Sequence, residues 1–257
     1  MKQKTIAELF DLSGKTAVVT GGAMGIGYGI VKRLAEAGAN IVIADMAEAE
    51  GMRRAKELKS AIFVKTDVSS ESDVKRLISE TTTKFGGLDI FVNNAGIYPP
   101  KPVLEMGLDL WEKIQAVNLR GVFLCSREAA KIMIEGGGGS IINIGSIDSL
   151  HPSMVGLAAY DASKHGVWGF TKNFALELAK NRIRVNAIAP GGISTEGVAD
   201  MMKGAAKETL KEFEAKVPLG RFGQPDDIAT VALFLASGAS AYMTGSMVVV
   251  DGGVLLR

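Results

Sequence analysis

The chain alternates between two patterns of apolar and polar positions. Short, nearly continuous apolar runs are separated by longer segments in which apolar residues recur at helical spacing. The apolar runs predict strands at residues 16–20, 40–44, 61–65, 88–92, 140–144, 184–188 and 246–250. The longer segments predict helices at residues 25–37, 47–59, 70–85, 108–133, 159–179 and 226–236, with a break in the fourth near Asn118.

Strands and helices in this alternation indicate an α/β fold, a Rossmann-like doubly wound parallel sheet that helices flank on both faces. The 257 residues suit one large α/β domain, and no Pro/Ser-rich linker, repeat or shift in composition divides them. The tetraglycine at residues 136–139 is too short for a linker, so we expect it to end one helix and turn into the next strand. The prediction is a single domain over residues 1–257.

Composition narrows the function classes. Apolar residues make up 47% of the chain and the mean hydropathy is +0.20, which predicts a large core or extra apolar surface between subunits. The 29 Lys and Arg barely exceed the 28 Asp and Glu, so no basic excess favours nucleic acid as a partner.

A lone Cys125 excludes intrachain disulfides and multi-cysteine metal sites, and with two histidines no metal site is expected. No apolar stretch has the length of a signal peptide core or a membrane span, so we expect a cytoplasmic protein with no membrane partner.

A glycine-rich turn, TGGAMGIG, joins the first predicted strand to the first predicted helix over residues 20–27. Its spaced glycines are Gly21, Gly25 and Gly27. Without a Cβ, such a turn lets backbone N–H groups approach a dinucleotide pyrophosphate at the positive end of the helix. The alternative is an ordinary strand-to-helix turn, but an acidic residue, Asp45, ends the next strand as a dinucleotide site requires.

The type of dinucleotide follows from Asp45. A carboxylate there can accept both ribose hydroxyls of the adenosine and would repel a 2′-phosphate. Met24 and Met46 occupy the nearby positions where a basic side chain would serve the phosphorylated cofactor. The sequence therefore predicts NAD rather than NADP.

Two polar residues on one predicted helix could move a proton. Tyr160 and Lys164 are four positions apart, so they project from one face. An ammonium about 4 Å from the phenol, at an effective dielectric of about 20, is worth roughly 4 kcal/mol and would bring the tyrosine pKa from about 10 toward neutrality. The phenolate could then take a substrate hydroxyl proton as hydride leaves carbon, and the phenol would be the acid in the reverse direction.

A serine could complete the chemistry at the end of the fifth strand. Ser146 follows that strand at the carboxyl edge of the sheet, where ligands bind, and its hydroxyl can donate to a developing oxyanion. Ser149 is close enough to compete for this role, and we rank it second, as a substrate contact.

With these motifs in this order, the sequence resembles the classical short-chain dehydrogenase/reductase family over nearly its whole length. The matching segments are TGGAMGIG, Asp67-Val68, NNAG at residues 93–96, Asn118, Ser146, YDASK at residues 160–164, and PGG at residues 190–192 followed by Ser194-Thr195. One departure is Gly145, which precedes Ser146 where the family often has a second serine.

The resemblance implies a full set of site residues and an assembly. The implied catalytic residues are Asn118, Ser146, Tyr160 and Lys164, with Asn118 holding a water that links Lys164 to solvent. The implied cofactor contacts are Gly21, Met24, Gly25, Ile26, Gly27, Asp45, Met46, Asp67, Val68, Asn94, Ala95, Gly96, Tyr160, Lys164, Pro190, Gly191, Ile193 and Thr195. The implied substrate contacts are Ser146, Asp148, Ser149, Tyr160 and Gly192, under a lid at about residues 194–217. A homotetramer is also implied, through the helices at residues 116–133 and 159–179 and the tail at 254–256.

The hypothesis is therefore an NAD-dependent oxidoreductase that moves hydride between the cofactor and a secondary alcohol, expected to be a sugar, polyol or related hydroxy compound. The start of the chain, residues 9–15, resembles family members that act on sugars and sugar acids. Alternatives are a reductase of 3-oxoacyl thioesters, which usually uses NADPH and so conflicts with Asp45, and a steroid or ketone reductase. A non-catalytic NAD-binding sensor is disfavoured because such proteins generally lose the catalytic tyrosine or lysine, and this chain retains both.

Overall fold

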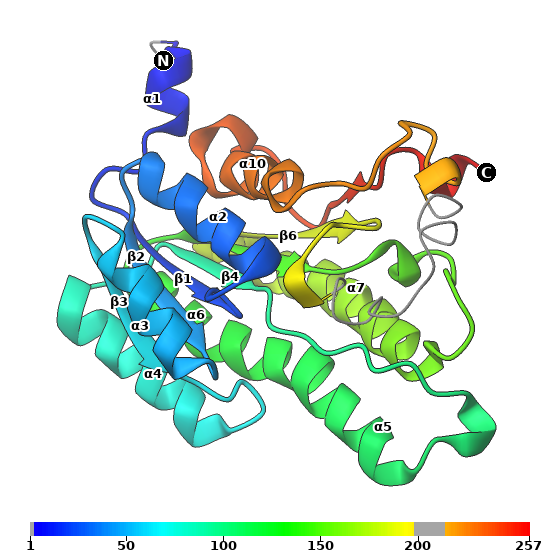
Figure 1. Cartoon of the computed structure of the whole chain (residues 1–257). Helices are drawn as coiled ribbons and strands as arrows, with labels where there is room; N and C mark the ends of the chain where they lie inside the picture. The colour runs from blue at the N-terminus through cyan, green and yellow to red at the C-terminus, as the bar shows by residue number, and fades with distance from the viewer. Residues whose placement is uncertain (1–2, 198–213) are drawn as a thin grey trace.

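Seven parallel strands make up one sheet in the computed structural model, which describes residues 3–197 and 214–257. The strand order is β3-β2-β1-β4-β5-β6-β7. The strands are β1 (Thr16–Thr20), β2 (Asn40–Asp45), β3 (Ala61–Lys65), β4 (Ile90–Asn93), β5 (Gly139–Ile144), β6 (Ile183–Pro190) and β7 (Met247–Val250). The α-helices of the described residues are α1 (Ile6–Phe10), α2 (Gly25–Glu36), α3 (Glu48–Lys56), α4 (Glu71–Phe85), α5 (Leu108–Gln115), α6 (Gly121–Glu135), α7 (Ala158–Leu178) and α10 (Pro225–Ala236). The predicted doubly wound parallel sheet is confirmed (Figure 1).

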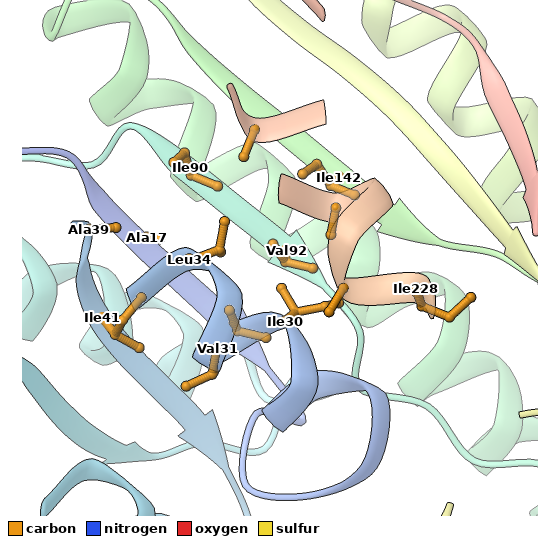
Figure 2. Close-up of a cluster of buried hydrophobic side chains, with 14 of the residues drawn as sticks. Ala17, Ile30, Val31, Leu34, Ala39, Ile41, Ile90, Val92, Ile142 and Ile228 are labelled. Atoms are coloured by element: carbon orange, nitrogen blue, oxygen red, sulfur yellow. The ribbon is translucent and has the colours of Figure 1, made fainter. Parts of the chain in front are cut away.

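The sheet is buried on both faces. Helices α2, α3 and α10 cover one face, and α4, α6 and α7 cover the other. On the first face, Ile30 and Leu34 of α2 and Ile228 of α10 lie in one cluster with Ile90 and Val92 of β4 (Figure 2). Burying each such large side chain contributes about 1.5–3 kcal/mol relative to leaving it in water. Strand β1 is buried at every position, as expected for a strand between two helical layers.

The order of the strands creates a crevice beside β1. Strand β1 lies between β2 and β4, so the direction in which successive strands are added reverses there. In open parallel sheets, ligands bind at such a point, outside the carboxyl ends of the strands. The residues that follow β1, β4 and β5, including Gly21, Asn94 and Ser146, therefore lie along one edge of the sheet.

The predicted break near Asn118 is a π-helical turn, Ala116–Arg120, between α5 and α6. A π turn holds one residue more than an α-turn and is frequent at functional sites. The turn packs against α7 and leaves Asn118 0% exposed. The buried Asn118 amide therefore has a defined place in the fold, at the π turn between α5 and α6.

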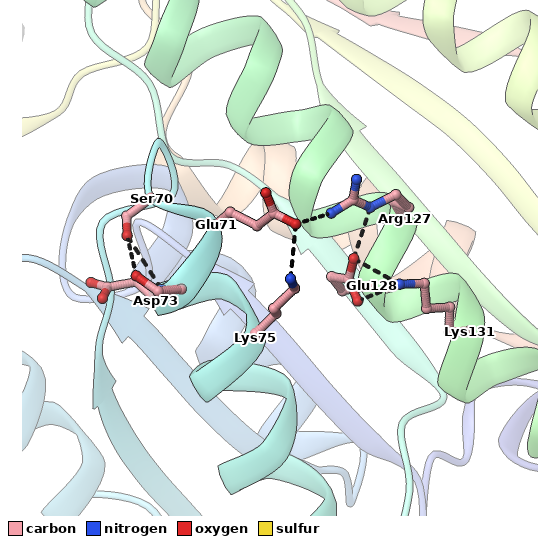
Figure 3. Close-up of polar contacts among 8 residues, drawn as sticks. Ser70, Glu71, Asp73, Lys75, Arg127, Glu128 and Lys131 are labelled. Atoms are coloured by element: carbon pink, nitrogen blue, oxygen red, sulfur yellow. Dashed lines mark hydrogen bonds and ion pairs between the residues drawn. The ribbon is translucent and has the colours of Figure 1, made fainter.

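Ion pairs join α4 to α6 on the second face. The Arg127 guanidinium donates to Glu71 at 2.8 Å, and Arg127 and Lys131 both donate to Glu128 (Figure 3). Partial burial opposes ionisation of Glu128, but the hydrogen bonds from Lys131 and Arg127 outweigh it and lower the pKa of this carboxyl. Because water screens the exposed members of this network, apolar packing by residues such as Leu77 does more to hold the two helices together.

Helix α1 was not among the predicted elements. It has five residues, too few to show helical periodicity. A capping box marks its start, because Thr5 accepts a hydrogen bond from the Glu8 N–H and Glu8 accepts one from the Thr5 N–H. This reciprocal pair was the signal in the sequence that could have identified the helix.

The predicted substrate lid, at about residues 194–217, lies mostly outside the described residues, because these stop at 197 and resume at 214. Within the described ranges, no helix is both long enough and apolar enough to cross a bilayer.

Candidate active site

The glycine-rich turn folds tightly against itself between β1 and α2. Gly21 and Gly25 have φ angles of 62° and 53°, in the left-handed region that favours glycine. A Cβ on Gly27 would lie 2.0 Å from the carbonyl oxygen of Gly21 and 2.6 Å from the side-chain nitrogen of Asn94. The backbone could not take this path with a larger residue at position 27.

The turn presents backbone donors toward the sheet edge. Met24 precedes α2 without capping the helix through its side chain, so it leaves the first N–H groups of α2 without a capping partner from its own position. Uncapped N–H groups and the positive end of a helix are the donors that a pyrophosphate requires. Ile26 is half-buried and packs against the core. The residues present therefore fit a dinucleotide.

Asp45 connects the turn to the end of β2. One carboxylate oxygen accepts a hydrogen bond from the Ala23 N–H and the other accepts one from the Ala47 N–H, both at 3.0 Å. Each oxygen retains a lone pair for a further donor, such as a ribose hydroxyl. Met24 and Met46, the two neighbouring positions singled out in the sequence, are 43% and 58% exposed.

Asn94 braces the same turn from the β4 side. Its side-chain nitrogen donates to the carbonyls of Thr20 and Gly21, at 2.9 and 3.0 Å. The Thr20 hydroxyl in return accepts the N–H groups of Asn94 and Ala95. Asn94 is therefore a structural brace, and it places the following residues beside the glycine turn.

The remaining predicted cofactor contacts lie at the ends of β3 and β6. Past β3, Asp67 accepts hydrogen bonds from the backbone and hydroxyl of Ser69, while Val68 packs on Gly121. Past β6, Gly191 donates its N–H to the last carbonyl of β7. Their roles toward a ligand stay predictions.

Two of these contacts follow β6. Ile193 is buried and forms an isolated parallel bridge to Gly223. The Thr195 side chain lies 3.4 Å from where a Cβ of Gly25 would be, so this segment approaches the glycine turn directly. The segment that follows β6, which ends at Pro190, therefore lies beside the start of α2.

Tyr160 and Lys164 both lie on α7, facing the end of β5. The Lys164 ammonium is 5.6 Å from the centre of the Tyr160 ring and donates to the Ile144 carbonyl at 2.7 Å. Ser146 follows β5 directly, at the start of the 3-10 turn Ile147–Ser149. The predicted phenol, ammonium and hydroxyl therefore come together at the carboxyl edge of the sheet.

The ionisation of this pair differs from the expectation. Desolvation raises the pKa of Tyr160 well above its ordinary value; hydrogen bonding from Ser146 opposes the rise, and the charges of Asp148, Tyr98 and Asp161 add to it. The expected lowering by Lys164 is not seen in the free protein, because its ammonium is directed to a backbone carbonyl and burial dominates. Burial also lowers the pKa of Lys164 to about 8. At neutral pH the free site therefore holds a neutral phenol.

Asn118 joins the group from the π turn. Its side-chain oxygen accepts the Ile97 N–H and its nitrogen donates to the Ile97 carbonyl, both at 2.8 Å, and also to the Ser163 hydroxyl at 3.2 Å. A Cβ on Gly96 would lie 3.4 Å from the Asn118 oxygen and 3.7 Å from the Lys164 nitrogen. Asn118 and Lys164 thus approach the same stretch of backbone, and the linking water stays a prediction.

The two candidate serines have different surroundings. The Ser146 hydroxyl donates to Asp148 at 2.8 Å, at the edge where Tyr160 lies. The Ser149 hydroxyl is buried and donates to the Lys164 carbonyl at 3.0 Å. The Ser149 hydroxyl thus ties the 3-10 turn to α7, and its contact with a substrate stays a prediction. Gly192, another expected substrate contact, is exposed beside the Phe222 ring.

One aromatic residue at the site was not foreseen. The Tyr98 ring meets the Tyr160 ring edge to face, with centroids 6.1 Å apart and an angle of 72° between the planes. Tyr98 follows the NNAG segment by two residues, and its place beside the catalytic tyrosine depends on the course of a loop that periodicity does not describe.

Comparison with known proteins agrees with this geometry. A family model described as enoyl-(acyl carrier protein) reductase matches residues 21–255. A short-chain dehydrogenase/reductase from Aspergillus oryzae is 40% identical over 254 residues, which span 96% of this chain and 97% of the relative. A 3-oxoacyl-[acyl-carrier-protein] reductase from Aquifex aeolicus is 38% identical over 248 residues, 95% and 98% of the two chains. The chain belongs to the short-chain dehydrogenase/reductase family.

Solved structures of this family share the fold closely. A short-chain type dehydrogenase/reductase from Mycobacterium marinum superposes with a TM-score of 0.91 at 37% identity, covering 98% of this chain and all of that one. A candidate gluconate dehydrogenase from Agrobacterium tumefaciens gives a TM-score of 0.91 at 35% identity, with 97% and 99% coverage. As a short-chain dehydrogenase/reductase, the protein is an oxidoreductase that uses a nicotinamide cofactor.

The tight turn gives a direct test of the cofactor site. In a Gly27→Ala variant, the new methyl group would meet the Gly21 carbonyl and push the turn away from the sheet edge. We expect NADH affinity, measured by fluorescence titration, to fall about tenfold or more. Gly87→Ala is the control, because nothing lies within 4 Å of its Cβ. Wild-type affinity in the Gly27→Ala protein would mean that the turn does not hold the cofactor.

Proposed function

We propose that the protein is an NAD-dependent oxidoreductase that interconverts a secondary alcohol and its ketone, with Tyr160 as the general acid and base. The observation that carries this proposal is the meeting of Tyr160, Lys164 and Ser146 at the sheet edge beside the glycine turn. A bound nicotinamide supplies or accepts the hydride. Tyr160 exchanges the proton with the substrate oxygen, and Ser146 donates a hydrogen bond to that oxygen.

The Lys164 charge and the Asn118 amide support Tyr160 in this scheme. Lys164 is the buried cation next to the phenol, and its lowered pKa lets it give up a proton more readily than an ordinary lysine. Asn118 holds the backbone at Ile97 and so fixes the wall beside Lys164. Both residues act on the proton at the Tyr160 oxygen and need not touch the substrate.

The proposed substrate is a sugar, a polyol or a related hydroxy compound. A polar site edge, with the Asp148 carboxylate and the Tyr98 and Ser146 hydroxyl groups near Tyr160, favours a substrate rich in hydroxyl groups. The similarity to a candidate gluconate dehydrogenase points the same way. A second candidate is reduction of 3-oxoacyl thioesters, favoured by relatives of that description at 38% and 39% identity.

NAD is the proposed cofactor because of Asp45. Its carboxylate closes the end of β2, where the adenosine ribose of a dinucleotide on this turn would lie. A negative charge at that place accepts ribose hydroxyls and repels a 2′-phosphate.

A homotetramer is also proposed, through α6 and α7. Phe123 of α6 is 42% exposed and Leu176 of α7 is 78% exposed. Phe170 stacks on Phe174 and meets Phe123 edge to face, so an aromatic cluster spans both helices. Large apolar side chains left in water on neighbouring helices favour association with another copy.

The catalytic assignment is tested by Tyr160→Phe. This change removes only the hydroxyl, so we expect kcat to fall about 10²- to 10⁴-fold while NADH affinity stays near the wild-type value. Turnover is measured at the reduced nicotinamide band with a panel of sugars, polyols, steroids and β-keto esters. Ser149→Ala should keep most of the activity, because its hydroxyl faces the backbone of α7. Full turnover by Tyr160→Phe would refute the assignment.

The cofactor assignment is tested by changing the end of β2. The double change Asp45→Ser with Met46→Arg removes the repelling charge, adds a cation, and keeps a hydroxyl to accept a backbone N–H. We expect the ratio of kcat/KM for NAD to that for NADP to fall at least about tenfold. Met46→Arg alone is the control and should shift the ratio less. A wild-type protein that already prefers NADP would contradict the proposal.

The assembly is tested by placing a charge on α7. Leu176→Glu should leave the folded subunit intact, because the side chain is exposed, but it would bury a carboxylate in the proposed interface. We expect the mass measured by light scattering to drop from a tetramer to a smaller species. Ile6→Glu on α1 is the control. A tetramer in the Leu176→Glu protein would exclude this interface.

A further inference from the structure

A buried carboxylate stands beside the catalytic serine. Asp148 is 5% exposed and lies two residues after Ser146. One of its oxygens accepts the Ser153 N–H and the other accepts the Ser146 hydroxyl, both at 2.8 Å. No ion pair of the described residues includes Asp148, and the nearby Lys164 ammonium is bonded to the Ile144 carbonyl instead. The charge of Asp148 therefore makes no direct ion pair among the described residues, although it acts at a distance to raise the pKa of Lys164 against the effect of burial.

The Ser146 hydroxyl has one proton to donate, and two acceptors compete for it: the Asp148 carboxylate and the Tyr160 oxygen. A hydroxyl can donate one hydrogen bond, and the structure gives that bond to Asp148. Ser146 also lies against Tyr160, where a hydrogen bond from it would stabilise the phenolate and lower the pKa of the phenol. While Asp148 holds the serine proton in the free site, Ser146 stabilises the phenolate less, and in the proposed reaction the serine would turn this proton to the substrate oxygen.

We propose that Asp148 is a positioning residue that holds the Ser146 proton and thereby keeps Tyr160 in its proton-donating form near neutral pH. The inference rests on the proposed function and adds to it the pH range over which Tyr160 acts as an acid. In the reduction, hydride with its two electrons adds to the carbonyl carbon and the C=O π bond opens. The substrate oxygen takes the proton of Tyr160, which is left as phenolate, while the nicotinamide is oxidised and the carbonyl is reduced.

Other groups facing Tyr160 do not share this role. Tyr98 meets the ring from the loop after β4 and adds to the raised pKa of Tyr160, and Lys164 lies one turn along α7 and donates to the Ile144 carbonyl. Asp161 also lies on α7, and partial burial followed by the charge of Asp148 raises its pKa. Its charge acts on Tyr160, as that of Asp148 does, but it has no hydrogen bond to Ser146. Asp161 is therefore a matched control.

The charge of Asp148 determines in which direction its removal moves the pKa of Tyr160. A negative group near Tyr160 disfavours the phenolate and raises the pKa of the phenol, so removing it lowers that pKa. Oxidation needs the phenolate and reduction needs the phenol. The pH profile of kcat/KM for oxidation and the one for reduction should therefore both move to lower pH when Asp148 is neutralised.

The experiment compares pH profiles of kcat/KM in both directions for the wild type, Asp148→Asn and Asp161→Asn. Ethyl acetoacetate with NADH and ethyl 3-hydroxybutyrate with NAD are the first substrate pair, replaced by a faster pair where the substrate panel shows one. In Asp148→Asn, we expect the pH profiles of kcat/KM for oxidation and for reduction both to move down by on the order of one pH unit. Asp161→Asn should move them less. Asp148→Ser removes the same charge and replaces Asp148→Asn if that variant does not fold.

The outcomes separate the inference from the proposed function. The role of Asp148 would be overturned if the pH profiles of kcat/KM stay in place in the Asp148 variant. It would also be overturned if they move equally in Asp161→Asn. Either result would leave the oxidoreductase assignment intact. A wild-type protein that binds NADH but turns over no member of the panel would overturn the proposed function, and the role of Asp148 would fall with it.

Discussion

Asn94 connects the ends of β4 and β1 through hydrogen bonds from its amide to the carbonyls of Thr20 and Gly21. Both carbonyls lie at the end of β1, and leaving a buried acceptor unpaired costs about 1–3 kcal/mol. The same contact forbids a side chain at Gly27. It also brings the backbone after β4 beside Lys164. One amide thus sets both the shape of the dinucleotide turn and the wall of the catalytic group.

Desolvation, more than pairing, governs the ionisation of that group. Desolvation is the largest influence on the pKa of both Tyr160 and Lys164, and it favours the neutral form of each. It therefore raises the pKa of Tyr160 and lowers the pKa of Lys164. Spacing alone suggested an ammonium aimed at the phenol, but the ammonium satisfies the Ile144 carbonyl. In the free protein Tyr160 therefore keeps its proton, as the proposed role of acid requires. The proposed role of base requires that other charges in the assembled site favour the phenolate.

The strands, the helices beyond α1 and the meeting of Ser146, Tyr160 and Lys164 could be predicted because they depend on periodicity and on motifs at strand ends. The place of Asn118 beside them was expected only from the resemblance to the family. Boundaries were less certain: β4 was expected at residues 88–92 and spans Ile90–Asn93. The orientation of hydroxyl groups and the approach of Tyr98 could not be predicted, because each depends on how loops cross above the sheet. Periodicity says which face of an element is buried, but not which acceptor a buried hydroxyl selects.

Asp45 shows why cofactor preference and the shape of the turn are coupled. Its two oxygens each accept a backbone N–H, from Ala23 and from Ala47, so the carboxylate supports the turn before any ribose arrives. A substitution that only removes the charge would leave two N–H groups without acceptors and loosen the pyrophosphate cradle as well as the ribose site. If the protein uses NAD as proposed, a replacement at Asp45 can change the preference to NADP without disturbing the turn only if it still accepts those hydrogen bonds. Selectivity at the ribose is limited by the backbone that the same side chain holds in place.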